Sequence, residues 1–228
     1  MITELKKRLM GLLLCAIGLV QAAAEPFTSL HIVDLDGQAL ANAVVILDAT
    51  GLGAPAEPVS GQIIDQKDFR FVPQVLAVAK GSAVRFPNSD KSRHQVYSFS
   101  PAKTFDLALY GGNQVPKVRF DRTGLVVLGC NIHDSMMGFV YVVDSGLFAV
   151  SDTQGYAALP AYDAAQASQL TVWHAQLEQD IQLSLAELNA LLASDADLVL
   201  PIHLHLEAPM APASDLRSRL QGYASYDY

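Results

Sequence analysis

Cysteine is scarce in this sequence. The 228 residues include only two cysteines, Cys15 and Cys130. Residues 1–24 have the pattern of a cleaved secretory signal, because three basic residues precede an apolar run over 9–20 and small residues at 22–24. The alternative is an uncleaved membrane anchor, but a spanning helix needs about 20 apolar residues. Cleavage would leave Cys130 alone in an oxidising compartment, where it needs a partner chain, a reactive role or a metal.

Basic residues are few as well. The chain has 15 lysines and arginines against 23 acidic residues, a net charge of −8. Three of the basic residues and one acidic residue lie in residues 1–24, so the remaining chain has 12 against 22 and a net charge of −10. Such a chain lacks the basic face that nucleic acid requires. The acidity suits a basic protein partner, since opposite charges speed encounter, although it also simply keeps an exported protein soluble.

Helical periodicity is absent between residues 27 and 143. Apolar and β-branched runs alternate there with turn residues, a pattern typical of an all-β sandwich or barrel. The predicted strands are Ser29–Val33, Ala43–Asp48, Gln62–Gln66, Val75–Ala79, Ala83–Pro87, Gln95–Ser98, Val118–Phe120, Gly124–Leu128 and Gly138–Val143. Four more are predicted at Phe148–Val150, Tyr156–Leu159, Gln169–Trp173 and Leu198–Leu206. The sequence therefore predicts a mainly β fold.

One helix is predicted, over residues 184–193. Ser184 and Glu187 have the spacing of a capping box, and four leucines give the segment an apolar face. Residues 209–228 are dominated by Ala, Pro, Ser, Tyr and Asp and are predicted to form a flexible tail.

One loop collects side chains that bind metals. Cys130, His133 and Met136 lie between a predicted strand that ends at Leu128 and another that begins at residue 138. A second histidine, His94, lies 36 residues before the cysteine, at the start of an earlier strand. A thiolate, two imidazoles and a weakly bound thioether are the ligands of a blue-copper electron-transfer site. The pattern therefore favours one copper ion that exchanges a single electron.

The residues around this loop resemble a known family. Residues 130–140 (CNIHDSMMGFV) are similar to the copper loop of cupredoxins such as plastocyanin and amicyanin, and residues 86–96 (FPNSDKSRHQV) to the stretch that carries their first histidine. The group known as methylamine utilisation proteins shares Phe-Pro-Asn-Ser-Asp and Gly-Cys-Asn-Ile-His. The resemblance covers residues 63–143 and implies a Greek-key β-sandwich without catalytic activity. It assigns one type 1 copper ion to His94, Cys130, His133 and Met136.

Two positions are left open by this resemblance. Many cupredoxins have Asn or Ser after the first histidine to tie the two ligand loops together, whereas this chain has Gln95. Met136 and Met137 compete for the axial place, and only one can face the metal because neighbouring strand residues point in opposite directions. The family spacing favours Met136.

These residues have other interpretations. Cys130 could be an ordinary buried cysteine, or a nucleophile paired with His133. A zinc site fits less well, because zinc usually takes four ligands with more cysteine or histidine. His203 and His205 share one face of a predicted strand and could form a second metal site, but solvent-facing histidines are the more ordinary interpretation. His174 is interpreted as structural.

The segments on either side of residues 60–145 resemble two halves of a carboxypeptidase-regulatory-like (transthyretin-like) sandwich. The first half is residues 34–45 (DLDGQALANAVV), and the second is residues 151–159 (SDTQGYAAL) with 170–173 (LTVW). We therefore predict a cupredoxin domain at 60–145 inserted into a sandwich domain made of 25–50 and 146–208. The alternative is that residues 28–50 are the first strands of the cupredoxin. Pairing of strands 29–48 with strands in 148–206 is required by the insertion.

These patterns predict a periplasmic copper protein that carries one electron and is not stably inserted in the membrane once its signal is removed. Its redox partner is expected to be a basic c-type cytochrome or a periplasmic dehydrogenase. The alternative is a protein that stores, delivers or senses copper with the same ligands. A metal-free sandwich that serves in adhesion or assembly is a third interpretation.

Overall fold

The computed structural model describes residues 29–49, 58–144, 147–160, 167–194 and 199–202. Within them the fold is mainly β with one helix, as the sequence predicts. The predicted signal, the predicted tail, and His203 and His205 lie outside the described residues. No helix of the described part is long and apolar enough to cross a membrane.

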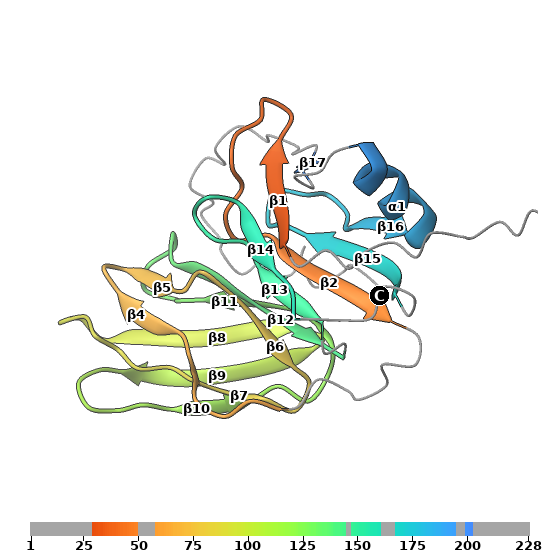
Figure 1. The fold of residues 1–228 in the computed structure, drawn as a ribbon. Helices are drawn as coiled ribbons and strands as arrows, with labels where there is room; N and C mark the ends of the chain where they lie inside the picture. Colours follow the sequence, from red (N-terminus) through yellow and green to blue (C-terminus); the bar gives the residue numbers. More distant parts are fainter. Residues whose placement is uncertain (1–28, 50–57, 145–146, 161–166, 195–198, 203–228) are drawn as a thin grey trace, which may run out of the picture.

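The central strands form what we call the first sandwich. Its strands are β3 (Gln62–Ile63), β4 (Asp65–Lys67), β5 (Arg70–Val72), β6 (Val75–Ala79), β7 (Ala83–Arg85), β8 (His94–Ser100), β9 (Lys103–Tyr110), β10 (Lys117–Arg119), β11 (Gly124–Gly129) and β12 (Met137–Val143). A five-stranded sheet in the order β6-β12-β11-β8-β9 faces a small sheet in the order β10-β7-β3 (Figure 1). The hairpin β4–β5 forms a separate two-stranded sheet, and its Phe71 joins the core between the two larger sheets.

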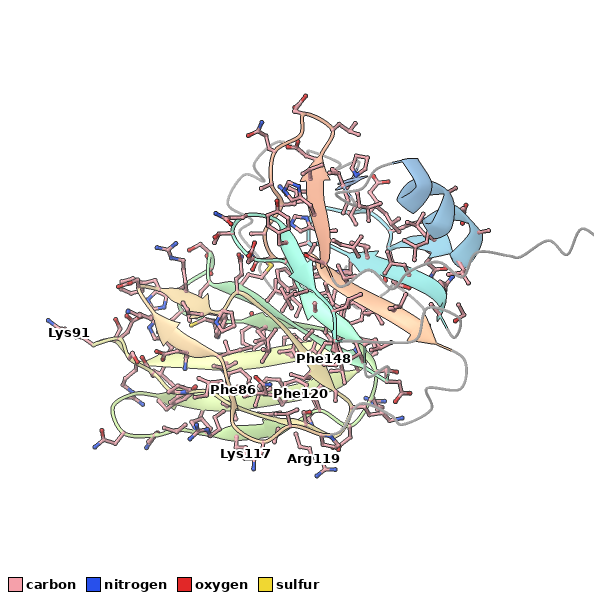
Figure 2. The ribbon with its side chains drawn as sticks, in the orientation of Figure 1. Phe86, Lys91, Lys117, Arg119, Phe120 and Phe148 are labelled. Atoms are coloured by element: carbon pink, nitrogen blue, oxygen red, sulfur yellow. The ribbon has the colours of Figure 1, made fainter. Side chains whose placement is uncertain are left out.

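The sandwich core follows from the alternation of apolar and polar residues along each strand. In β10, Val118 is buried between the exposed Lys117 and Arg119. Figure 2 shows these two basic side chains pointing away from the sandwich, and Phe86 and Phe120 lying inside it. Cys130 belongs to the same core, where its exposed fraction is 0%.

Three strands were not predicted from the sequence: β5, β9 and β16 (Ile181–Ser184). Strand β9 lies at the edge of its sheet and pairs only with β8. Alternate side chains of an edge strand face water, so its lysine, threonine and aspartate hide the apolar signal of a core strand. Periodicity alone therefore fails to identify it.

The remaining elements form the second sandwich. They are β1 (Ser29–Asp34), β2 (Val44–Ala49), β13 (Phe148–Val150), β14 (Tyr156–Ala158), β15 (Ala167–Trp173), β16, α1 (Leu185–Ser194) and β17 (Val199–Ile202). The sheet β14-β1-β17 faces the sheet β13-β2-β15-β16, and Leu188 of α1 joins the core between them. The helix begins with the predicted capping box, because the Ser184 hydroxyl and N–H both donate to the Glu187 carboxylate, at 2.7 and 2.8 Å.

The first two strands pair with strands that lie more than 100 residues later. Strand β1 pairs with β14 and β17, and β2 pairs with β13 and β15. Within the described residues, neither joins a sheet of the first sandwich. These are the pairings that an insertion of the first sandwich into the second requires.

The two sandwiches share a third core. Outward-facing residues of the five-stranded sheet, including Val127, Phe139 and Tyr141, pack against Val44, Ile46 and Trp173 of the second sandwich and against Phe148 of β13. In Figure 1 strands β2, β13 and β15 run across this face of the first sandwich. Strands β6, β12, β11 and β8 of the five-stranded sheet are therefore covered on both faces, whereas the edge strand β9 is not.

Candidate metal centre

The loop between β11 and β12 brings three predicted ligands to one end of the first sandwich. Gly129 and Met137 are paired partners at the ends of the two strands, so residues 130–136 form a closed loop. The N–H of Met136 donates to the carbonyl of His133 at 2.9 Å, and the N–H of His133 lies 3.4 Å from the carbonyl of Cys130. These tight turns place the side chains of Cys130 and His133 on the same side.

His94 reaches this loop from the neighbouring strand. It is the first residue of β8 and pairs with Tyr110, whereas Val96 pairs with Leu107, so Ala108 and Leu109 of β9 stand opposite the single residue Gln95. This bulge belongs to β9 and bends that strand beside the pair of His94 and Tyr110. His94 points inward and is 0% exposed.

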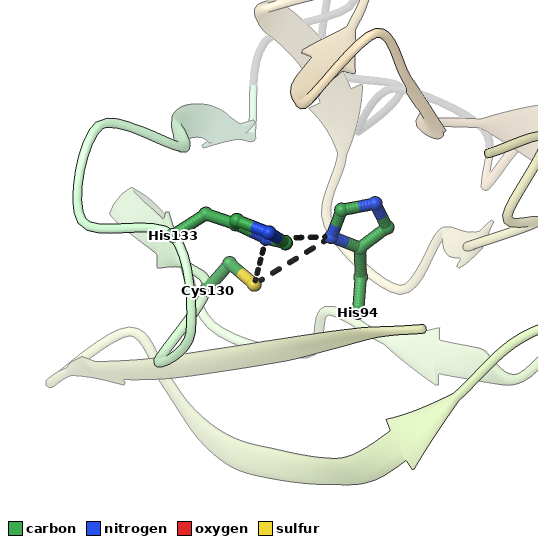
Figure 3. A group of neighbouring side chains, drawn as sticks. All are labelled: His94, Cys130 and His133. Carbon is green, nitrogen blue, oxygen red and sulfur yellow. Dashed lines mark hydrogen bonds between the residues drawn. The ribbon is translucent and has the colours of Figure 1, made fainter. Parts of the chain in front are cut away.

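The three side chains converge, as Figure 3 shows. The Nδ1 atoms of His94 and His133 are 3.0 Å apart, and the Cys130 Sγ lies 3.8 and 3.7 Å from them. Cys130 and His94 are fully buried, and His133 is half-buried. Of the histidine, cysteine and acidic side chains in the described residues, these three form the one group that could hold a metal ion.

The spacing fits three ligands of one ion. Bonds of about 2.0 Å to nitrogen and about 2.3 Å to sulfur, the lengths found with zinc, place the ligand atoms about 3 to 4 Å from one another. A buried thiol with two imidazole nitrogens at such distances is a soft, mixed donor set. The residues present therefore fit a copper ion.

The two methionines face opposite cores. Met136 is 0% exposed and belongs to the core that contains Cys130. Met137 packs against the third core, between the two sandwiches. This arrangement agrees with the alternation expected of neighbouring residues, and it leaves Met136 as the thioether on the side of the ligand group.

Gln95 does not link the ligand loops. Its side chain donates to Asp106 on β9, at 2.6 Å. The loop before His94 is instead held by the buried Asn88, whose Nδ2 donates to the carbonyls of Ser92 and Tyr110, at 2.9 and 3.1 Å. The Tyr110 hydroxyl donates to a carbonyl in the same core, and burial raises the pKa of this tyrosine.

Two residues without a predicted role in the site, Asp90 and Phe69, contact the candidate ligands. The Asp90 carboxylate accepts from Nε2 of His94 at 2.8 Å. Phe69, at the tip of the β4–β5 hairpin, places its ring edge-on against His133 and His94, with centroid distances of 4.9 and 5.8 Å. Desolvation alone would raise the pKa of Asp90, but hydrogen bonds from the N–H groups of Phe69 and Asp68 and from His94 outweigh it and lower that pKa.

A sequence signal for Asp90 does exist, since an aspartate four residues before a candidate ligand is within reach of its ring. Phe69 has no such sequence signal, because it is 25 residues from His94 and contacts it only through the fold.

His174 lies in the second sandwich, away from the ligand group. Its ring Nε2 is 3.2 Å from the carbonyl of Ala41, and burial lowers its pKa. This placement fits the structural role expected for it.

Comparison with solved structures finds cupredoxins. A copper-containing nitrite reductase from Thermus scotoductus SA-01 is 25% identical over 42% of this chain and 25% of its own, with a TM-score of 0.35. The reduced Cu(I) form of an amicyanin variant is 16% identical over 43% of this chain and 97% of its own, with a TM-score of 0.34. A purple cupredoxin from Nitrosopumilus maritimus is 21% identical over 35% of this chain and 95% of its own, with a TM-score of 0.32.

No protein-family model matches the sequence, and no curated protein matches it. The matched share of this chain is less than half in each of the three structures, and the likeness is low. What the chain can do is therefore argued from the geometry of its own residues.

Proposed function

We propose that this protein is a type 1 copper protein that carries one electron. The observation that carries the proposal is the convergence of two histidine Nδ1 atoms and the Cys130 Sγ within 3.8 Å, at the end of a closed β-sandwich. Met136, buried in the same core, completes the His, Cys, His and Met set of an electron-transfer site.

Each ligand has a distinct role in this proposal. Cys130 is the soft, electron-donating ligand, and full burial excludes water from its sulfur. His94 is fixed deep in the core, whereas the half-buried His133 provides the side of the site that is nearest to solvent. Copper bound there would supply the chemistry, a change between Cu(I) and Cu(II). The two strands that begin or end at the ligands hold them in place through both states.

Burial and ligand number favour a carrier over the alternatives. A protein that delivers copper needs a ligand group that can open to a recipient, but here the thiol and one imidazole are fully buried. A catalytic metal site keeps an open position for substrate. Four protein ligands leave none, so we assign no enzymatic activity.

The setting of the proposed function follows from the sequence. A removable signal over residues 1–24 would place the protein in the periplasm, and the acidic remainder would favour a basic c-type cytochrome or a dehydrogenase as redox partner. The exposed Phe69 beside His133 gives such a partner an apolar contact near the site. We further propose that residues 25–50 and 146–208 form one discontinuous domain that serves in docking.

The test is to produce the chain with copper and record visible and EPR spectra and a voltammogram. We expect intense blue Cu(II)–thiolate absorption and reversible one-electron cycling in the wild type. Cys130→Ser should lose the colour, while His174→Gln, which changes a buried histidine outside the site, should keep it. A colourless protein that binds copper and gives it readily to a chelator would favour storage or delivery. A wild type that binds no copper would refute both.

A further inference from the structure

Asp90 connects the deepest ligand to a surface hairpin. It lies in the loop between β7 and β8, four residues before His94, and its side chain is 12% exposed. Its carboxylate oxygens receive three donors: the N–H of Asp68 at 2.8 Å, the N–H of Phe69 at 3.1 Å and the Nε2 of His94 at 2.8 Å. The N–H of Asp90 itself donates to the Asn88 side chain at 2.9 Å, which fixes its position.

These contacts determine the tautomer of His94. Two of the three neighbours are backbone N–H groups, which can only donate, so the Asp90 side chain acts as a carboxylate acceptor. His94 must then carry its proton on Nε2. In the neutral ring, the form that binds a metal, this leaves a lone pair on Nδ1, the atom that faces Cys130 and His133.

We propose that Asp90 is a positioning residue of the metal centre, which presents His94 through Nδ1 and lowers the reduction potential of the copper. This inference rests on the proposed function. A carboxylate that accepts from the outer nitrogen of a ligating histidine makes the imidazole a stronger donor. A stronger donor stabilises Cu(II) more than Cu(I), because the doubly charged ion gains more from it.

The Asp90 carboxylate also holds the turn at Asp68 and Phe69, which covers the site. Asp68 and Phe69 have φ values of 53° and 58°, in the left-handed region that residues other than glycine rarely adopt. Hydrogen bonds from both of their N–H groups to Asp90 stabilise this turn. This turn places the Phe69 ring against the rings of His94 and His133. Asp90 therefore fixes both the orientation of one ligand and the packing around the pair.

The decisive measurement is the reduction potential of the copper-loaded full chain and its Asp90→Asn variant. The matched control is Asp65→Asn. Asp65 also braces the β4–β5 hairpin, through the hydroxyl and N–H of Ser89, but makes no hydrogen bond to a ligand histidine. Removing such an outer partner typically weakens metal binding about 10- to 100-fold. We expect the ratio of Cu(II) to Cu(I) affinity to fall about 10-fold in Asp90→Asn, which raises the potential by about 59 mV.

The control and a rescue variant separate this role from a structural one. Asp65→Asn should move the potential much less, and Asp90→Glu, which restores the charge, should return it toward the wild-type value. A blue Asp90→Asn protein whose potential is unchanged, lowered or shifted only as far as that of Asp65→Asn would overturn the proposal.

The tautomer is tested without copper. In the metal-free wild type, ¹⁵N NMR of the imidazole groups should show His94 protonated on Nε2, a result that needs neither a stable variant nor bound metal. A neutral His94 ring with its proton on Nδ1 in place of Nε2 would overturn the proposal even if the protein proves to be a blue-copper carrier. Failure of the wild type to bind copper would instead refute the proposed function and with it the assigned effect on the potential.

Discussion

Replacing Gly138 with alanine tests how tightly the β4–β5 hairpin packs against β12, beside the candidate ligands. Gly138 lies on β12, directly after the ligand loop, and a Cβ added there would lie 2.9 Å from Cβ of Phe71 and 3.1 Å from two of its ring atoms. Non-bonded carbon atoms prefer separations of about 3.5 to 4.0 Å. Phe71 is a buried residue of β5, so the whole strand would have to move.

Two opposing effects set the magnitude of this change. Replacing a strand glycine with alanine gains about 0.5 to 1 kcal/mol of backbone entropy. Overpacking a core usually destabilises by about 1 to 3 kcal/mol, and it should win here because the nearest atom is attached to the backbone. The net loss should lower the unfolding temperature by several degrees, since about 1 kcal/mol corresponds to about 2 to 4 °C in a protein of this size.

The assay is thermal and urea unfolding of the metal-free protein, with the visible spectrum of the copper form as a second reading. The spectrum should also change, because β5 follows the turn that carries Phe69. The control is Gly111→Ala, where the nearest atom is Cγ of Arg93 at 3.2 Å, so the neighbour has to shift by less than Phe71 does. In a Phe71→Gly background, which removes the Cβ together with the ring, the penalty of Gly138→Ala should shrink. An unchanged midpoint, or the same penalty in both backgrounds, would show that this contact is not the constraint.

Three further outcomes are expected. Phe69→Ala should keep the unfolding free energy within about 0.5 kcal/mol of the wild-type value, as for other exposed side chains. It should also speed the loss of copper to a chelator, because it uncovers His133. An unchanged release rate would contradict the role of Phe69 as a cover. Ser151→Ala should lower the unfolding free energy by about 1 to 3 kcal/mol in urea titrations without altering the copper spectrum, because a buried hydroxyl there joins two backbone groups. The wild type should lose stability below about pH 6.5, because the lowered pKa of the buried His174 means that its ring is protonated more readily in the unfolded chain. In His174→Gln the unfolding free energy should fall less steeply with acidification. Equal slopes of unfolding free energy against pH for both proteins between pH 7.5 and 5 would argue otherwise.

The loop of candidate ligands could be predicted from the sequence because its residue types are rare and close together. Cys130, His133 and Met136 lie within seven positions between two apolar runs, so their shared loop follows from chain order alone. His94 required the added inference that its strand is a neighbour of β11, and the structure places it there. The pairing of β1 and β2 with distant strands was anticipated from local likeness to another sandwich.

The residues around the candidate site could not be predicted from the sequence in this way. Phe69 is exposed and stands in a turn, so its sequence context resembles that of an ordinary surface residue. Its contact with the histidines depends on where the β4–β5 hairpin folds, and β5 is too short to show a period. Likewise β9 was missed because its outward residues are polar. Contacts made across the fold leave little trace in the local pattern.

The third core sets a limit on cutting this molecule down. A shortened protein made of residues 60–144 would present Val127, Phe139 and Tyr141 to water, on the face now covered by Trp173 and its neighbours. A contiguous apolar surface of that kind promotes self-association. Any shortened version of this protein would therefore first need polar substitutions on that face, before any change to the candidate ligands.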